Sequence, residues 1–77
     1  MKKAEVKRQF LRNIKCWNTL EEIAKKNADE SLKKLNVAKH EKDFQDECRY
    51  HAMKNALALL GESLELFTKE EYEEIMK

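Results

Sequence analysis

Apolar side chains recur every three or four positions along the first half of the chain. Because this spacing matches one face of an α-helix, it predicts a single long amphipathic helix over about residues 3–35. The positions that share this face are Val6, Phe10, Ile14, Trp17, Leu20, Ala24, Ala28, Leu32 and Leu35.

The apolar pattern changes phase near residue 36. Extending the first stripe would place Lys39 and Lys42 on the apolar face, so the second stripe cannot continue the same helix. Asn36 stands where the phase changes, and Asn tolerates the left-handed conformation that ends helices. We therefore expect a tight turn over about residues 36–39, followed by a second helix over about 40–67. The second stripe consists of Phe44, Cys48, Ala52, Asn55, Leu59 and Leu66.

A short turn makes the two helices antiparallel neighbours. In this arrangement the numbers of facing positions sum to about 74, which places Trp17 opposite Leu57 and Phe10 opposite Leu64. Apolar residues then meet along the seam. The sequence thus predicts a helical hairpin.

A third helix is predicted over about residues 69–77. Thr68 with Glu71 three positions later forms a capping-box pattern, in which each side chain bonds the other residue's backbone N–H. Phe67 and Tyr72 occupy the positions of a hydrophobic staple. We therefore expect an all-α fold in which residues 1–77 form one helical domain.

Gly61 is the only glycine, and the chain contains no proline. It could end the second helix, or it could lie inside the helix and let a neighbouring backbone approach closely. The apolar face continues across it to Phe67, so we favour a continuous helix.

The second helix carries another apolar face besides the one that packs on the first helix. A hairpin cannot cover both faces, and the short third helix could cover only part of the second one. Because exposed contiguous apolar surface usually marks an interface, we expect a homodimer whose two hairpins form a four-helix bundle. The alternative is a three-helix monomer. The expected dimer interface consists of Met53, Ala56, Leu57, Leu60, Leu64 and Phe67.

The charges are balanced in number but separated along the chain. Sixteen Lys or Arg stand against fifteen Asp or Glu, yet residues 1–36 hold ten basic and five acidic side chains and residues 61–77 hold two and six. The hairpin returns both ends to the same place. We therefore expect residues 2–8 to lie within reach of the acidic side chains of residues 70–74, where the two groups neutralise each other.

Five basic residues gather on the back of the first helix, within a sector of about 60° at 100° per residue. We call them the basic ridge, and they are Arg8, Arg12, Lys15, Lys26 and Lys33. The ridge predicts a small protein–protein interaction module, of the regulator, adaptor or inhibitor type, that dimerises and recognises an acidic protein partner. The alternative is a nucleic-acid-binding accessory protein that uses the same ridge for phosphate contacts.

The sequence favours no catalytic, cofactor or metal site. It has no glycine-rich loop or nucleophile elbow, so we expect a protein that is not an enzyme and needs no cofactor. His51 follows Glu47 at a spacing that differs from the di-metal motif of helical bundles, and Ile23, Lys26 and Asn27 on the facing helix supply no acid. We expect His51 to lie partly buried at the edge of the core.

The remaining features point to a soluble cytoplasmic protein. Cys16 and Cys48 lie too far apart along the hairpin for a disulfide, and we expect both to be small buried core residues. Trp17 is expected to anchor the core, and His40 to lie in the turn. No apolar run approaches the roughly 20 residues of a membrane span, so no membrane partner is expected.

Overall fold

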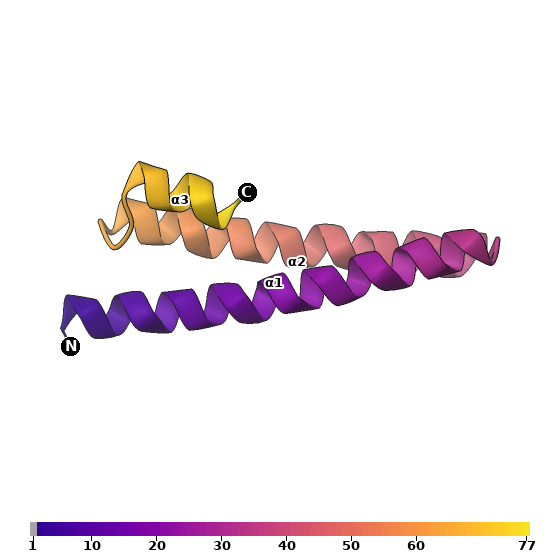
Figure 1. Cartoon of the computed structure of the whole chain (residues 1–77), viewed down its shortest axis with the longest axis horizontal. Helices are drawn as coiled ribbons and strands as arrows, with labels where there is room; N and C mark the ends of the chain where they lie inside the picture. The colour runs from indigo at the N-terminus through magenta and orange to yellow at the C-terminus, as the bar shows by residue number, and fades with distance from the viewer. Residues whose placement is uncertain (1) are drawn as a thin grey trace.

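The computed structural model describes residues 2–77, and Met1 lies outside the described residues. Three helices follow one another: α1 (Lys3–Lys33), α2 (Val37–Ser63) and α3 (Lys69–Ile75). α1 and α2 form an antiparallel pair in a rod 49 Å long, and α3 folds back along the C-terminal end of α2 (Figure 1). The described chain is all-helical, which confirms the predicted hairpin with a short third helix.

The turn between α1 and α2 is shorter and lies earlier than predicted. α1 ends at Lys33 instead of residue 35, and Leu35 takes the left-handed conformation with φ of 56°. The N–H of Asn36 donates to the carbonyl of Ser31 at 3.0 Å, and the N–H of Leu35 donates to that of Leu32 at 3.0 Å. These two bonds define a Schellman motif, which satisfies carbonyls at the end of the helix.

Asn36 therefore has a different role from the predicted one. Its side chain accepts a hydrogen bond from the backbone N–H of Lys39 at 3.2 Å, which makes it the N-cap of α2. α2 consequently begins at Val37 instead of residue 40. The prediction placed the phase change correctly but assigned Asn36 to the wrong helix end.

α2 passes through Gly61, as predicted, but it ends at Ser63 and not at residue 67. A second Schellman motif terminates it: the N–H of Leu66 donates to the Gly61 carbonyl at 2.8 Å, and Glu65 has φ of 61°. The turn redirects Leu66 and Phe67 into the interior, where both are buried. The apolar pattern across Gly61 thus reflects core packing by a loop and not a longer helix.

The capping box of α3 is present as predicted. The Thr68 hydroxyl oxygen accepts from the N–H of Glu71 at 3.1 Å, and the Glu71 carboxylate accepts from the N–H of Thr68 at 3.0 Å. α3 ends at Ile75, two residues before the predicted end. Both bonds lie within four residues, which is why the sequence alone could specify them.

The core lies at the end of the rod where α3 packs. Ile14, Ala58 and Phe67 are buried there, and Phe67 is 4% exposed. A Cβ atom on Gly61 would overlap the ring of Phe67, so the only glycine provides the space in which this ring sits. The core position of Phe67 removes it from the predicted dimer interface. Around the cluster pack Phe10, Leu57, Tyr72, Ile75 and Met76.

The seam keeps the predicted α1 stripe at Ile14, Ala24 and Ala28, but on α2 it is displaced by about one residue, since Ala58 is buried and the predicted Leu59 is exposed. Ala24, Ala28 and Ala58 are buried in it, and such small side chains permit close approach of two helices. Leu20, predicted to lie in the seam, is exposed. Towards the turn, Leu32 and Leu35 are also exposed. Polar side chains occupy the space between the helices instead: Asn18, Glu21, Ser31, Asp43 and Lys54.

Candidate interaction surfaces

A polar cluster joins the two long helices near the middle of the rod. Lys54 on α2 is 5% exposed, and its Nζ lies 2.8 Å from Glu21 Oε1 and donates to Asn18 Oδ1 at 2.9 Å. His51 Nδ1 lies 2.9 Å from Glu21 Oε2. The prediction that α1 supplies no acid opposite His51 was therefore wrong, and the half-exposed imidazole lies within hydrogen-bond distance of Glu21.

Glu21 is the acceptor at the centre of this polar cluster. Burial by itself would raise the pKa of Glu21, but hydrogen bonds from Lys54 and His51 lower that pKa below its usual value. The carboxylate is thus ionised at neutral pH and compensates the buried ammonium of Lys54. The contacts of Lys54 with Glu21 and Asn18 fix the register of α1 against α2. The charges of Lys54 and Glu21 are paired with each other.

A second polar contact lies near the turn. Ser31 Oγ is 3.2 Å from Asp43 Oδ2, and Lys39 Nζ donates to the same oxygen at 2.7 Å. The hydrogen bond from Lys39 holds the pKa of Asp43 below its usual value, despite burial. Beside it, His40 Nδ1 lies 2.7 Å from the Ala28 carbonyl, which accepts only, so Nδ1 carries the proton. His40 thus belongs to the first turn of α2 and not to the turn where it was predicted.

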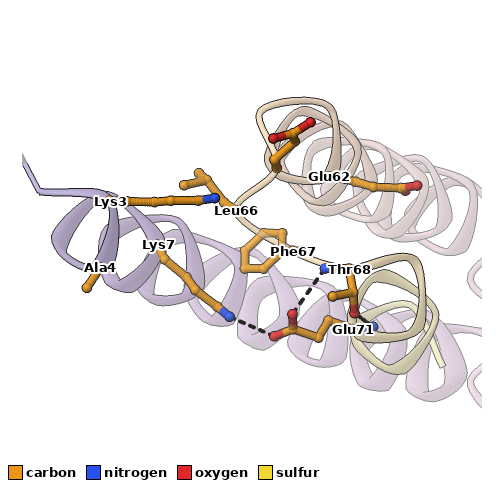
Figure 2. Close-up of a pocket in the computed structure, with 9 residues that line it drawn as sticks. Lys3, Ala4, Lys7, Glu62, Leu66, Phe67, Thr68 and Glu71 are labelled. Carbon is orange, nitrogen blue, oxygen red and sulfur yellow. Dashed lines mark hydrogen bonds and ion pairs between the residues drawn. The ribbon is translucent and has the colours of Figure 1, made fainter.

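The two ends of the chain meet as the charge pattern predicted. Lys7 Nζ lies 2.8 Å from Glu71 Oε2 and 5.8 Å from the ring centre of Phe67 (Figure 2). The hydrogen bond from Lys7 lowers the pKa of Glu71, and the Thr68 N–H adds to that effect. An open pocket lies between the start of α1 and the loop before α3, where Lys3 and Glu62 also line it. Lys7 and Glu71 thus join the two ends of the chain by an ion pair.

One broad side of the hairpin presents apolar side chains to solvent. We call it the open face, and its α2 part is the predicted dimer interface without Phe67. Met53, Leu60 and Leu64 are exposed there, and Leu57 is half-buried. The open face comprises Cys16, Leu20 and Ile23 on α1 and Met53, Ala56, Leu57, Leu60 and Leu64 on α2.

The open face lies opposite the side that α3 covers. α3 approaches α1 at Leu11, which lines a pocket with Ile75, and it bonds α2 through Tyr72 and Asn55. At about 100° per residue, Leu20 lies about 180° around α1 from Leu11. By the same count, the outward direction of Met53 differs by about 160° from that of Asn55. α3 therefore leaves the apolar residues of the open face uncovered.

A smaller apolar patch surrounds the hairpin turn. Leu35 is 83% exposed, and Leu32, Val37 and Phe44 are also exposed around it. The ring of His40 stacks on that of Phe44 beside the patch. Four lysines lie at the same end of the rod: Lys33, Lys34, Lys39 and Lys42. The patch is separated from the open face by Asp46, Arg49 and Lys42.

The basic ridge lies on the outside of α1. All five of its side chains are exposed, and no ion pair among residues 2–77 involves any of them. Glu22 and Glu30 are exposed on the same side of the helix, so the ridge is interrupted by negative charge. The ridge is thus a surface of unpaired cations with acidic residues between them.

The structure corrects three expectations for single residues. Cys16 and Cys48 are both exposed and unbridged, and neither is the buried core residue that was expected. Trp17 is half-buried and packs on Tyr50, with ring centroids 5.9 Å apart. Leu57, its predicted partner, packs on the core cluster instead. On α2 the seam is displaced by about one residue from the predicted stripe, which turns Cys48 outward, whereas Cys16 lies about 100° from the buried face of α1.

Comparisons with known proteins identify no relative of this chain. It matches no family model, and it has no significant match among curated proteins or solved structures.

Across residues 2–77, no group of three or more metal-ligating side chains is placed to hold an ion. No helix in the described part of the chain is long and apolar enough to cross a membrane.

Proposed function

We propose that the protein is a small protein–protein interaction module that works as a homodimer and recognises an acidic protein through its basic ridge. The open face supports this proposal most directly. Contiguous apolar surface on a small protein usually marks an interface, because its exposure to water is unfavourable. A second open face offers a matching apolar surface and would produce a four-helix bundle.

The basic ridge supports the second part of the proposal. Its cations have no partner within residues 2–77, and dimerisation through the open face would leave them outside the bundle. Exposed unpaired cations attract acidic surfaces and accelerate association with them. The acidic side chains of Glu22 and Glu30 within the ridge favour a partner with its own mixed pattern of charges.

Light scattering over a dilution series tests the dimer. We expect a mass of twice the 9.2 kDa of one chain at high concentration, falling towards one chain on dilution. A mass of one chain at every concentration would exclude the dimer.

A pair of neighbouring leucines provides a matched variant and control. Leu60 lies on the open face and is 49% exposed, whereas Leu59 is 45% exposed and points away from it. We expect Leu60→Glu to dissociate the dimer, because it places a charge in the apolar interface. Leu59→Glu introduces the same charge on the same helix and should leave the mass unchanged. Equal masses for both variants would show that another surface mediates association.

The exposure of the ridge also favours a second candidate function, binding to nucleic acid. Unpaired Lys and Arg side chains can contact phosphates, with an affinity that falls steeply as salt rises. Polyglutamate and double-stranded DNA serve as the two acidic probes at 50 mM salt. Binding of polyglutamate alone supports the protein partner, whereas a DNA mobility shift that Arg8→Glu and Arg12→Glu abolish supports the alternative.

A further inference from the structure

The hairpin turn forms one end of the rod, far from the start of α1 and from α3 (Figure 1). Leu35 and Val37 protrude from this end and are 83% and 76% exposed. We call these two side chains the apex. We propose that the apex inserts into the surface of a membrane that contains anionic lipids, with the lysines around it in contact with the lipid headgroups.

The local structure of the turn does not account for the two side chains of the apex. Leu35 has φ of 56°, a left-handed conformation that a side chain makes unfavourable and that helix ends usually assign to Gly or Asn. Val37 begins α2, although its β-branched side chain is a weaker helix former than Ala or Leu. Burial compensates neither of them. The apex thus places two aliphatic side chains in water without a benefit to the turn.

The charges nearest to the apex along the chain are positive. Four lysines and one acid, Glu41, give residues 31–42 a net charge of +3, whereas the whole chain carries +1. The next acids, Glu30 and Asp43, lie further from the apex, and Asp43 is already paired with Lys39. The other three lysines form no ion pair within residues 2–77. Such a group of cations is complementary to an anionic lipid surface. The four exposed lysines are Lys33, Lys34, Lys39 and Lys42.

The small size of this end favours a lipid surface over a protein partner. A specific protein interface uses about 20–30 residues on each side, and residues 31–42 provide only twelve. A bilayer requires no matching shape, because single apolar side chains can enter the boundary between headgroups and acyl chains. The expectation of no membrane partner rested on the lack of a spanning run, and attachment at the surface needs none.

The backbone of the turn is suited to contact with lipid because much of it is hydrogen-bonded within the chain. The N–H groups of Leu35 and Asn36 donate to the carbonyls of Leu32 and Ser31, both at 3.0 Å. The Asn36 side chain accepts from the N–H of Lys39. Since an unpaired backbone group is costly in an apolar medium, these bonds reduce the cost of insertion. The long lysine stems can follow the apex while their ammonium groups stay among the headgroups.

Flotation with vesicles of two compositions tests the proposal. At about 50 mM salt, we expect the native protein to bind phosphatidylcholine vesicles that contain about 30% phosphatidylserine. Binding to pure phosphatidylcholine should be roughly 100-fold weaker, because each unit of positive charge near an anionic surface contributes about a fivefold factor. Added salt should weaken the binding to the mixed vesicles. No binding to the mixed vesicles at low salt would refute the proposal.

Leu35→Asn removes half of the apex and is compatible with the turn, since Asn tolerates the left-handed conformation. This variant should bind the mixed vesicles roughly tenfold more weakly, because it loses the transfer of one leucine side chain out of water. Leu59→Asn is the matched control, since it replaces another exposed leucine on α2 far from the turn, and it should bind like the native protein. Circular dichroism checks that both variants are folded. Unchanged binding by Leu35→Asn would overturn insertion of the apex.

Neutralised lysines test the contribution of charge at the turn. Lys34→Gln with Lys42→Gln should weaken binding to the mixed vesicles by about 25-fold. Arg8→Gln with Arg12→Gln on the basic ridge changes the net charge by the same amount and should leave that binding nearly unchanged. The reverse result would show that the protein lies on the membrane along α1, which would contradict attachment through the turn.

A fluorescent label at the apex measures insertion directly. In a background of Cys16→Ser and Cys48→Ser, Val37→Cys provides a site for an environment-sensitive dye. Its emission should shift to the blue on the mixed vesicles and be quenched by lipids brominated in their acyl chains, whereas a dye attached through Leu59→Cys should show neither effect. If the native protein binds polyglutamate but no vesicles, and Leu35→Asn weakens that binding, the turn contacts an acidic protein and the proposal is refuted.

Discussion

Lys54 is the most deeply buried charged side chain among residues 2–77. Its ammonium group is almost fully removed from water, and a buried cation is tolerated only when an acid and further hydrogen-bond acceptors compensate it. Glu21 and Asn18 provide both. The pair contributes little net stability, but the loss of one partner leaves a buried charge uncompensated.

This asymmetry leads to a prediction for Lys54. Lys54→Met should lower the free energy of unfolding by about 2 kcal/mol, because Glu21 loses its ammonium partner and keeps only the hydrogen bond with His51. Glu21→Leu with Lys54→Met should recover most of that loss. Urea unfolding at one fixed protein concentration measures both values. Equal destabilisation in the single and double variants would show that packing, and not charge compensation, determines the role of Lys54.

Acid sensitivity is also set by single residues. The pKa values of Glu21, Asp43 and Glu71 are lowered in the folded chain, so these groups stabilise the fold above their unfolded-state values of about 4. That stability is lost as the pH falls from about 5 through the lower folded-state pKa values. We expect the thermal midpoint to fall over this range.

Glu71→Gln isolates one of these contributions. Gln preserves the capping box but cannot pair with Lys7, so the variant should be less stable at neutral pH and should lose less stability on acidification. Glu70→Gln, at an exposed neighbour that makes no ion pair within residues 2–77, is the matched control. Thermal melts at pH 7, 5 and 3 compare them. The same acid dependence in both variants would contradict the contribution from Lys7.

For single residues, the sequence predicts an interaction fully only where its two partners lie a few positions apart. The Thr68 capping box was predictable because its partner lies three positions away. The burial of Lys54 was not, since an apolar stripe defines a helical face but leaves its rotation uncertain by about one residue, or 100°. On α2 that rotation placed Lys54 and Ala58 in the seam in place of Asn55 and Leu59.

The ends of the two long helices show a related limit for whole elements. Both end in Schellman motifs with a non-glycine residue, Leu35 or Glu65, in the left-handed conformation. Neither residue is a typical signal for such an end, which usually carries Gly. The glycine of this chain lies inside α2 instead. Its missing side chain leaves room for the ring of Phe67, which a Cβ atom at this position would overlap. A pattern-based boundary near residue 67 was therefore wrong by four residues.

Gly61 provides a prediction with an unusual sign. Gly→Ala inside a helix at an ordinary φ normally stabilises a protein by about 0.4–1 kcal/mol. Here the added methyl overlaps the buried ring of Phe67, so we expect Gly61→Ala to destabilise by about 1–2 kcal/mol. Urea unfolding tests this sign. In the presence of Phe67→Leu, which shortens the obstructing side chain, the cost of Gly61→Ala should become smaller, and an unchanged cost would locate the strain elsewhere.

For the whole molecule, the main feature is a small core at one end of a long rod. Among residues 2–77, six apolar side chains are buried, three of them alanine, while Leu11, Leu20, Ile23, Met53, Leu60 and Leu64 remain exposed along the hairpin. Burial of apolar surface is the dominant favourable contribution to folding. A single chain of this kind is expected to have low stability, and assembly would add the missing burial.

This reasoning predicts that unfolding depends on protein concentration. When folding and dimerisation are coupled, a hundredfold rise in concentration stabilises the dimer by about 2.7 kcal/mol, or about 1.4 kcal/mol per chain. For a chain of this size, that should raise the thermal midpoint by roughly 5–10 °C. Leu60→Glu should make the midpoint low and independent of concentration, whereas Leu59→Glu should retain the dependence. A native midpoint that stays constant over the hundredfold range would show that the small core suffices for the monomer and that the open face has another occupant.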